Sequence, residues 1–149
     1  TPILLLESVR DPLNVGAIIR SAAALGVGRI VMSADCADLY HPRTLRAAMG
    51  PLFSMPITRV EDLPGTIRAL RESGRRIYAA ALDASAVKLG QTAFDANDAV
   101  VIGNEGHGLS EQTIQACDGC LVIPMTARAE SLNAAAAAAI CIWETVRAK

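Results

Sequence analysis

Residues suited to ligand binding or catalysis gather in three short stretches of this 149-residue chain. The first contains Asn14 and, six residues later, Arg20. The second, from Gly103 to Gly108, places three glycines around Glu105. The third runs from Met125 to Asn133 and is followed by an alanine-rich segment. Together these stretches offer amides, a guanidinium, a carboxylate and adaptable backbone, which can bind and orient a small molecule, so they form the candidate site.

The glycine-rich stretch differs from the phosphate-binding loops of nucleotide sites. Its glycines at 103, 106 and 108 allow positive φ angles and a close approach of the backbone to a ligand. Their spacing is not GxGxxG, Glu105 would repel a pyrophosphate, and no Gly-Lys-Ser/Thr of a P-loop occurs. The stretch therefore favours a cationic or neutral small molecule. The alternative is that Glu105 is paired with Arg20 for structure.

Other kinds of catalytic site find little support in the sequence. No Ser-His-Asp arrangement, nucleophilic cysteine motif or metal-ligand cluster stands out. His41 and His107 fall in predicted loops, where a lone histidine is usually an exposed polar residue. Cys117 and Cys120 form a single CxxC with no second pair and no histidines at zinc spacing. We interpret all four cysteines as reduced apolar residues; a structural or redox role of the CxxC is the alternative.

Apolar runs alternate with helix-forming segments along the whole chain. The runs predict strands at 3–7, 29–32, 55–60, 75–82, 99–103 and 121–123, and the segments between predict helices at 14–25, 42–49, 62–72, 110–116 and from 131 onward. This pattern is typical of an α/β fold, here a parallel six-stranded sheet with helices on both faces. Ligands of such sheets bind beyond the carboxyl ends of the strands, where the three candidate stretches fall.

Two predicted helix starts coincide with candidate site residues. We interpret Asn14 as the N-cap of the first helix, which ends at Gly26. We interpret Ser131 as the N-cap of the last helix, with Glu130 beside the positive end of its dipole. A strand thus leads through a loop to a helix start whose N–H groups can face a ligand. An ordinary strand–loop–helix connection is the alternative.

The composition limits the class of protein. The length predicts one domain with a substantial core, made of aliphatic residues because only 3% of the chain is aromatic. A net charge of −1 neither favours nor excludes a nucleic-acid partner, and the arginine-rich segments 41–46 and 71–76 are solvated faces or, alternatively, RNA contacts. No signal peptide is visible, and no apolar run reaches the roughly 20 residues of a membrane span. We expect a cytoplasmic protein with no membrane or metal partner.

Three segments together resemble the motifs of one family. They are NVGAIIR at 14–20, VIGNEGHGLS at 101–110 and IPMTARAESLN at 123–133. They look like the three motifs of the SpoU/TrmH family, whose members are S-adenosylmethionine-dependent RNA ribose 2′-O-methyltransferases of the SPOUT superfamily. Order and spacing fit, and the resemblance covers essentially the whole chain. It implies methylation of a ribose 2′-hydroxyl in structured RNA, with rRNA as the first choice and tRNA as the second.

The resemblance also implies features of the fold that periodicity does not give. Members have a deep trefoil knot in the C-terminal strands and loops, contrary to the general rule that chains do not thread. They form homodimers in which the first and last helices pack near the pocket. Residues 1–149 then form one catalytic domain. Because 41–57 resembles members that have an additional N-terminal RNA-binding domain, we expect this chain to be the catalytic part of a longer protein.

The resemblance assigns roles to individual residues. Contacts to S-adenosylmethionine fall at Gly103, Ile123 and Leu132, with Met125 lining the pocket. Arg20 lies beside the target ribose and activates or orients the 2′-hydroxyl. A guanidinium stays protonated, so orientation is the safer role. The remaining motif residues, which position Arg20, the donor and the ribose, are Asn14, Glu105, Ser131 and Asn133.

The chain departs from the family pattern at two places, and two other functions stay open. Ala127 stands where the third motif usually has glycine, and Ala134-Ala135 where it usually has Val-Ser, which puts donor affinity in doubt but not the fold. One alternative is a catalytically silent homologue that binds RNA or the donor. The other is an ordinary nucleotide-binding α/β domain, which would have no knot and would bind NAD or ATP.

Overall fold

The computed structural model describes residues 2–48, 50, 54–81, 85–91, 93–126 and 132–147. Strands and helices alternate over most of these ranges, as the sequence predicts, but between residues 76 and 102 three strands follow one another in the described part of the chain. The strands are β1 Ile3–Leu6, β2 Arg29–Ser33, β3 Ile57–Val60, β4 Arg76–Ala80, β5 Val87–Lys88, β6 Asp98–Ile102 and β7 Gly119–Val122. The helices are α1 Pro12–Leu25, α2 Pro42–Ala48, α3 Leu63–Glu72, α4 Glu111–Ala116 and α5 Ala134–Val146.

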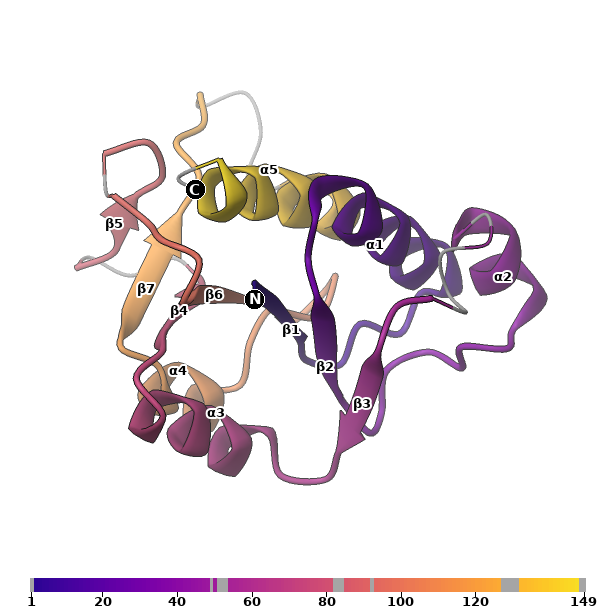
Figure 1. The fold of residues 1–149 in the computed structure, drawn as a ribbon, viewed down its shortest axis with the longest axis horizontal. Coiled ribbons are helices and arrows are strands. Elements are labelled where there is room, and N and C mark those ends of the chain that lie inside the picture. Colours follow the sequence, from indigo (N-terminus) through magenta and orange to yellow (C-terminus); the bar gives the residue numbers. More distant parts are fainter. Residues whose placement is uncertain are drawn as a thin grey trace.

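All strands of the described residues lie in one parallel sheet of order β3-β2-β1-β6-β4-β7-β5 (Figure 1). The predicted α/β fold with a parallel sheet is therefore confirmed, but the count of six strands is wrong. The seventh strand, β5, has two residues and pairs only with β7 at the edge, Val87 opposite Leu121 and Lys88 opposite Val122. Two residues are too few to produce an apolar run, so no sequence pattern indicated this strand.

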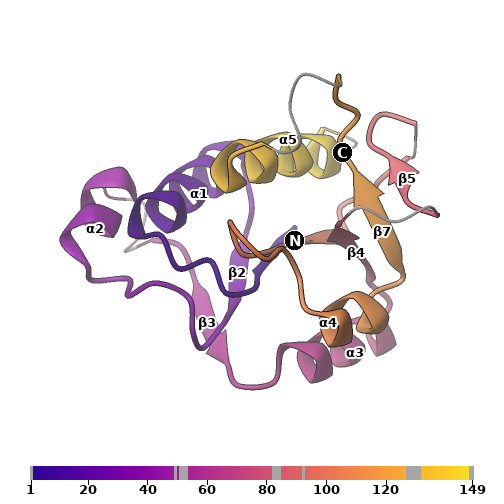
Figure 2. The same ribbon diagram turned by 180° about the vertical axis from the view of Figure 1, so that it is seen from behind.

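Helices cover both faces of the sheet, as Figures 1 and 2 show from opposite sides. Helices α1 and α5 lie on one face and α3 and α4 on the other. Successive side chains of a strand point to opposite faces, so Leu4 and Leu6 of β1 pack with α1 and α5, whereas Ile3 and Leu5 pack with α3 and α4. Burial on both faces explains why β1 reads as a continuous apolar run.

The two helix starts at candidate site residues differ from the prediction. Helix α1 begins two residues early, because Asp11 is its N-cap and accepts a hydrogen bond from the Leu13 N–H at 2.9 Å, and Pro12 has the fixed φ that suits a first turn. Asn14 is instead buried inside that turn. The N-cap of α5 is Asn133, and Ser131 lies outside the described residues. The predicted end of α1 is confirmed, with Gly26 in the left-handed conformation at φ 92°.

Helix α2 packs mainly against α1 rather than against the sheet. A Cβ atom on Gly16 of α1 would lie 2.5 Å from the Ala47 Cβ and 2.6 Å from the Thr44 carbonyl oxygen. The Thr44 hydroxyl also donates a hydrogen bond to the Pro12 carbonyl at 3.1 Å. Glycine at position 16 therefore permits the close approach of the two helices. Within the described ranges, no helix is both long and apolar enough to cross a membrane.

The substitution Gly16→Ala is predicted to lower the free energy of unfolding by about 1–2 kcal/mol, because the clash with α2 exceeds the gain in helix propensity of about 1 kcal/mol. Urea denaturation would measure the change. The matched control is Gly119→Ala, where the new Cβ would lie 3.9 Å from the Tyr78 ring, an ordinary contact. An unchanged or higher stability of Gly16→Ala would contradict this account of the helix pair.

Candidate functional site

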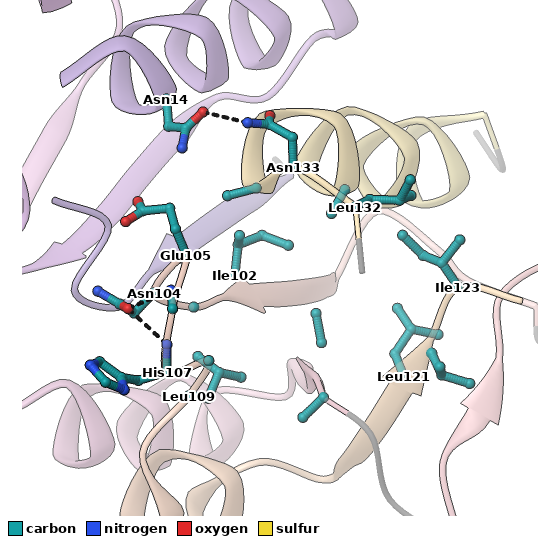
Figure 3. Close-up of a pocket in the computed structure, with 18 of the residues that line it drawn as sticks. Asn14, Ile102, Asn104, Glu105, His107, Leu109, Leu121, Ile123, Leu132 and Asn133 are labelled. Atoms are coloured by element: carbon teal, nitrogen blue, oxygen red, sulfur yellow. Dashed lines mark hydrogen bonds between the residues drawn. The ribbon is translucent and has the colours of Figure 1, made fainter. Parts of the chain in front are cut away.

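An open cavity of about 640 Å³ lies at the carboxyl ends of the central strands. Its wall is formed by the ends of β4, β6 and β7, the segment 103–109 after β6, and the first turns of α1 and α5 (Figure 3). The size is within the range of cofactor sites, and the position follows the rule for parallel α/β sheets. Helices and strands that are far apart in the sequence thus meet at this cavity.

Most of the predicted site residues lie around this cavity. Seven of the nine line it: Asn14, Gly103, Glu105, Ile123, Met125, Leu132 and Asn133. Arg20 is exposed on α1 and does not line it. Six residues along a helix correspond to about 600° of rotation, so Arg20 points about 120° away from Asn14. Ser131, like Ala127 and Glu130, lies outside the described residues.

Residues 104–108, which we call the glycine loop, form a tight hairpin. The Asn104 N–H donates to the Gly108 carbonyl at 3.1 Å, and the Gly108 N–H donates back to Asn104 at 2.9 Å. Gly108 has φ 66°, and a Cβ on Gly103 would lie 2.6 Å from the Gly108 carbonyl carbon. The sequence prediction of positive φ therefore applies to Gly108. Gly103 is required for a different reason, the close approach of the loop's own backbone.

A hydrogen bond joins the first turns of the two helices above the cavity. The Asn133 Nδ2 donates to the Asn14 Oδ1 at 3.0 Å (Figure 3). The Asn133 Oδ1 accepts from the Ala135 and Ala136 N–H groups at 2.9 and 3.2 Å, which fixes the orientation of the amide. Capping α5 and binding Asn14 therefore use the same side chain. This shared role explains why asparagine, with both a donor and an acceptor, suits position 133.

The cavity is polar at one end and apolar at the other. Figure 3 shows Glu105 below Asn14 and Asn133, with Ile123 and Leu121 at the opposite end. Met125 and Leu132 belong to the wall and are about 40% exposed. Among the described lining residues none is lysine or arginine, so the described part of the wall offers no lysine or arginine to a phosphate. The ion pairs of the described chain include neither Glu105 nor Arg20, so the structural pair considered from the sequence is absent there.

Part of the cavity wall consists of residues that were not predicted from the sequence. Asn104 lies beside Glu105 in the second motif, and its amide organises the glycine loop. Ala80 and Ala81 at the end of β4 also line the cavity. Small apolar residues carry no chemical signal of their own. The order of the strands, which brings β4 between β6 and β7, would have been needed to find them.

The cysteines do not form a second site. All four are buried thiols without a disulfide, as interpreted from the sequence. Burial raises the pKa of Cys117 and of Cys141 to about 12, and burial also raises the pKa of Cys36. A search of the described residues for groups of metal-ligating side chains finds none. His41 and His107 are exposed, as expected for loop histidines.

Comparison with known proteins adds a second line of evidence. Residues 1–143 match the SpoU rRNA methylase family. The chain belongs to this family. The resemblance of its three motifs is thus confirmed over nearly the whole sequence, and all seven predicted residues at the cavity lie within those motifs; Leu132 and Asn133 close the third. A purely nucleotide-binding α/β domain is no longer needed to explain the glycine-rich stretch.

Members of the SpoU family with known names resemble this chain closely. It is 36% identical over 141 residues to 23S rRNA (guanosine(2553)-2′-O)-methyltransferase RlmP of Bacillus subtilis, covering 95% of this chain and 56% of that protein. It is 36% identical over 145 residues to 23S rRNA (guanosine-2′-O-)-methyltransferase RlmB of Salmonella typhi, covering 97% and 59%. The chain thus spans about half the length of the curated relatives it matches.

Solved structures give the same result for the fold. An AdoMet-bound rRNA methyltransferase from Sinorhizobium meliloti superposes with a TM-score of 0.90 at 33% identity, covering 98% of this chain and 56% of that one. The SpoU methyltransferase AviRb from Streptomyces viridochromogenes, in complex with AdoMet, gives 0.83 at 36% identity, covering 97% and 59%. The parallel α/β fold described above is therefore shared with family members of known structure.

We predict that the native protein reacts very slowly with Ellman's reagent at pH 8. A shift of the Cys117 and Cys141 pKa from 9.0 to about 12 lowers the thiolate fraction about a thousandfold, and burial hinders access as well. In denaturant all four thiols should react at ordinary rates, which provides the internal control. Two thiols that react quickly in the native state would instead support a redox role of the CxxC.

Proposed function

We propose that this chain is the catalytic domain of an S-adenosylmethionine-dependent RNA methyltransferase that modifies a ribose 2′-hydroxyl. The proposed substrate is rRNA, with tRNA as the second choice. One observation carries the proposal: segments of all three family motifs surround a single cavity. The relatives named above as 2′-O-methyltransferases and the structures named with AdoMet support both the reaction and the donor.

The described residues fit S-adenosylmethionine. The apolar end of the cavity, with Leu121, Ile123 and Leu132, suits an adenine ring. Glu105 supplies negative charge at the polar end, where a sulfonium or an ammonium group is favoured and a phosphate is not. We propose that backbone groups at Gly103, Ile123 and Leu132 hold the donor and that Met125 packs against it.

The chain's own residues then contribute alignment more than acid or base strength. When bound, the donor supplies a methyl group on a sulfonium, which is already activated for attack by a hydroxyl. Asn14 and Asn133, joined by their hydrogen bond, offer a rigid polar edge beside the cavity for orienting the ribose. Apolar wall residues keep water away from the reacting atoms. Ser131 of the third motif lies outside the described residues, and its proposed role is the one that the resemblance implies, to help position the donor and the ribose.

We further propose a homodimer in which α1 and α5 form the interface. Leu13 and Arg20 are seven residues apart and share one exposed face of α1, with Leu13 49% exposed. On α5, Ile140 and Trp143 are 40% and 53% exposed, an unusual display of large apolar side chains. Because Arg20 does not line the cavity of its own chain, we propose that it reaches the ribose bound at the partner's cavity and stabilises the charge that develops on oxygen.

The proposal includes the deep trefoil knot that the resemblance implies for the C-terminal part of the chain. Two observations support a knot. Strand β7 lies between β4 and β5, and the helix that follows it, α5, packs on the same face of the sheet as α1. A knot there would bring the segment after β7 and the start of α5 to the same cavity.

Incubation of the protein with tritium-labelled S-adenosylmethionine and total RNA tests the reaction. We expect the label to enter RNA. After alkaline hydrolysis the label should remain in dinucleotides, because a 2′-O-methyl group prevents cleavage of the adjacent phosphodiester bond. Donor binding without transfer to rRNA or tRNA would instead support the catalytically silent homologue. If the protein neither binds the donor nor transfers its methyl group, the proposed function is contradicted.

The substitution Arg20→Ala is predicted to lower methyl transfer at least about a hundredfold, because one charge-stabilising donor is lost. The dissociation constant of S-adenosylmethionine should change less than about twofold, since Arg20 does not line the cavity of its own chain and is proposed to contact the ribose rather than the donor. The matched control is Arg68→Ala, because Arg68 is an exposed arginine of α3, on the opposite face of the sheet. This change should alter neither methyl transfer nor the dissociation constant. An equal loss of binding and transfer in Arg20→Ala would show that the assigned role is wrong.

A further inference from the structure

The glycine loop is attached to the residues that follow β1, which no part of the sequence analysis singled out. Glu7 and Ser8 come directly after β1, and they contact the chain on both sides of the loop. Asn104 begins the loop and Ser110 follows it. Residues about a hundred positions apart in the sequence are therefore joined beside the loop that lines the proposed donor site.

The Asn104 side chain uses both ends of its amide. Its Nδ2 donates to the Ser8 carbonyl at 2.7 Å. Its Oδ1 accepts from the Gly106 and His107 N–H groups at 2.8 and 2.9 Å, the latter drawn in Figure 3. One bond fixes the loop to the end of β1 and the other two fix the turn within the loop. In the sequence Glu105 lies between Asn104 and Gly106, so these hydrogen bonds hold the backbone on both sides of this carboxylate.

Glu7 holds the far side of the loop. It is only 8% exposed, and no lysine or arginine pairs with it among the described ion pairs. Its carboxylate accepts from the Ser110 N–H at 2.6 Å and the Ser110 hydroxyl at 3.1 Å, and from the Thr113 hydroxyl. A buried carboxylate is costly unless it is hydrogen-bonded, so these donors and Glu7 depend on each other.

Ser8 is itself held in one conformation. It is the only described non-glycine residue with positive φ, at 54°. Its N–H donates to the Ser33 Oγ at 2.8 Å and its hydroxyl donates to Asp35 at 2.7 Å. The hydroxyls of Ser33 and Ser8, and Arg10 to a lesser degree, hold the pKa of Asp35 at about 2. The carbonyl that accepts from Asn104 is thus presented in a fixed direction by the loop after β2.

We propose that Asn104 and Glu7 are positioning residues, which clamp the glycine loop to the end of β1 and so keep its backbone and Glu105 in the geometry that binds the methyl donor. The identity of the ligand rests on the function proposed above; the clamp itself rests only on the hydrogen bonds just described. Neither residue needs to touch the donor. A loop without the clamp would have to be ordered by the ligand, at the expense of affinity.

The test compares Asn104→Ala with Asn97→Ala, which removes an exposed asparagine from the turn before β6. Three quantities are measured: hydrogen exchange of the Gly106 and His107 amides by NMR, the dissociation constant of S-adenosylhomocysteine by calorimetry, and Tm. In Asn104→Ala we expect exchange of both amides to rise at least about tenfold and the dissociation constant to rise about tenfold or more. Tm should fall little more than in the control, because the site is at the surface.

Two further variants separate the parts of the clamp. Asn104→Asp keeps an acceptor for the two amides but cannot donate to Ser8, so we expect their protection to return while affinity stays reduced. Glu7→Gln keeps one acceptor for Ser110 and should raise the dissociation constant without unfolding α4. Unchanged exchange and affinity in Asn104→Ala would overturn the proposal, as would a loss of affinity matched by global unfolding in every variant.

Failure of the proposed function gives a different result. If the wild-type protein binds no S-adenosylhomocysteine, the donor assignment is wrong, and the exchange of Gly106 and His107 alone decides whether the clamp exists. If the wild type binds but Asn104→Ala binds equally well, the function stands and the clamp does not.

Discussion

The parallel pairing of β1 with β6 is the constraint on which the site depends. Leu6 lies opposite Ile102, and the Glu7 N–H continues the ladder to the Ile102 carbonyl at 2.9 Å. Both strands end there, so the chain that leaves β1 and the chain that leaves β6 emerge side by side. The first leads to Asn14 and the second to the glycine loop. Strand β4, which pairs with β6, and β7, which pairs with β4, run in the same direction, so the remaining wall of the cavity lies at the same edge.

Burial of this pair on both faces makes the arrangement rigid. Side chains of β1 and β6 pack under α1 and α5 on one side and with the α3 and α4 layer on the other. Leu5 and Leu6 are fully buried and lie on opposite faces. A shift of the register by one residue would send every one of these side chains to the wrong layer. The positions of the residues that follow the strands are therefore set by the core.

Much of the fold could be predicted from sequence because the signals were local. Apolar runs located β1, β2, β6 and β7 to within two residues, and Gly26 marked the end of α1. The predictions that failed concerned features that are set by adjacent residues or by contacts with distant parts of the chain. Pro12 moved the start of α1 so that Asp11 became its cap, and Asn133 capped α5 where Ser131 was expected. Two-residue β5 exists only because β7 offers a free edge.

The candidate site shows the same division. Polar and glycine residues in three motifs could be recognised in sequence, and seven of the nine predicted residues line the cavity. The same was not possible for Ala80 and Ala81, or for the hydrogen bond between Glu7 and Ser110. Their importance comes from contacts across the sheet rather than from residue type. Arg20 marks the limit of reasoning within one chain: its place in the motif is clear, yet it points away from the cavity that the motif forms.

The most direct test of this account is a crystal structure of the protein grown with S-adenosylhomocysteine. We expect the ligand in the cavity between the glycine loop and the side chains of Ile123 and Leu132, with its amino-acid end towards Glu105. Ligand bound at another face of the sheet, with this cavity left vacant in a well-ordered crystal, would contradict it.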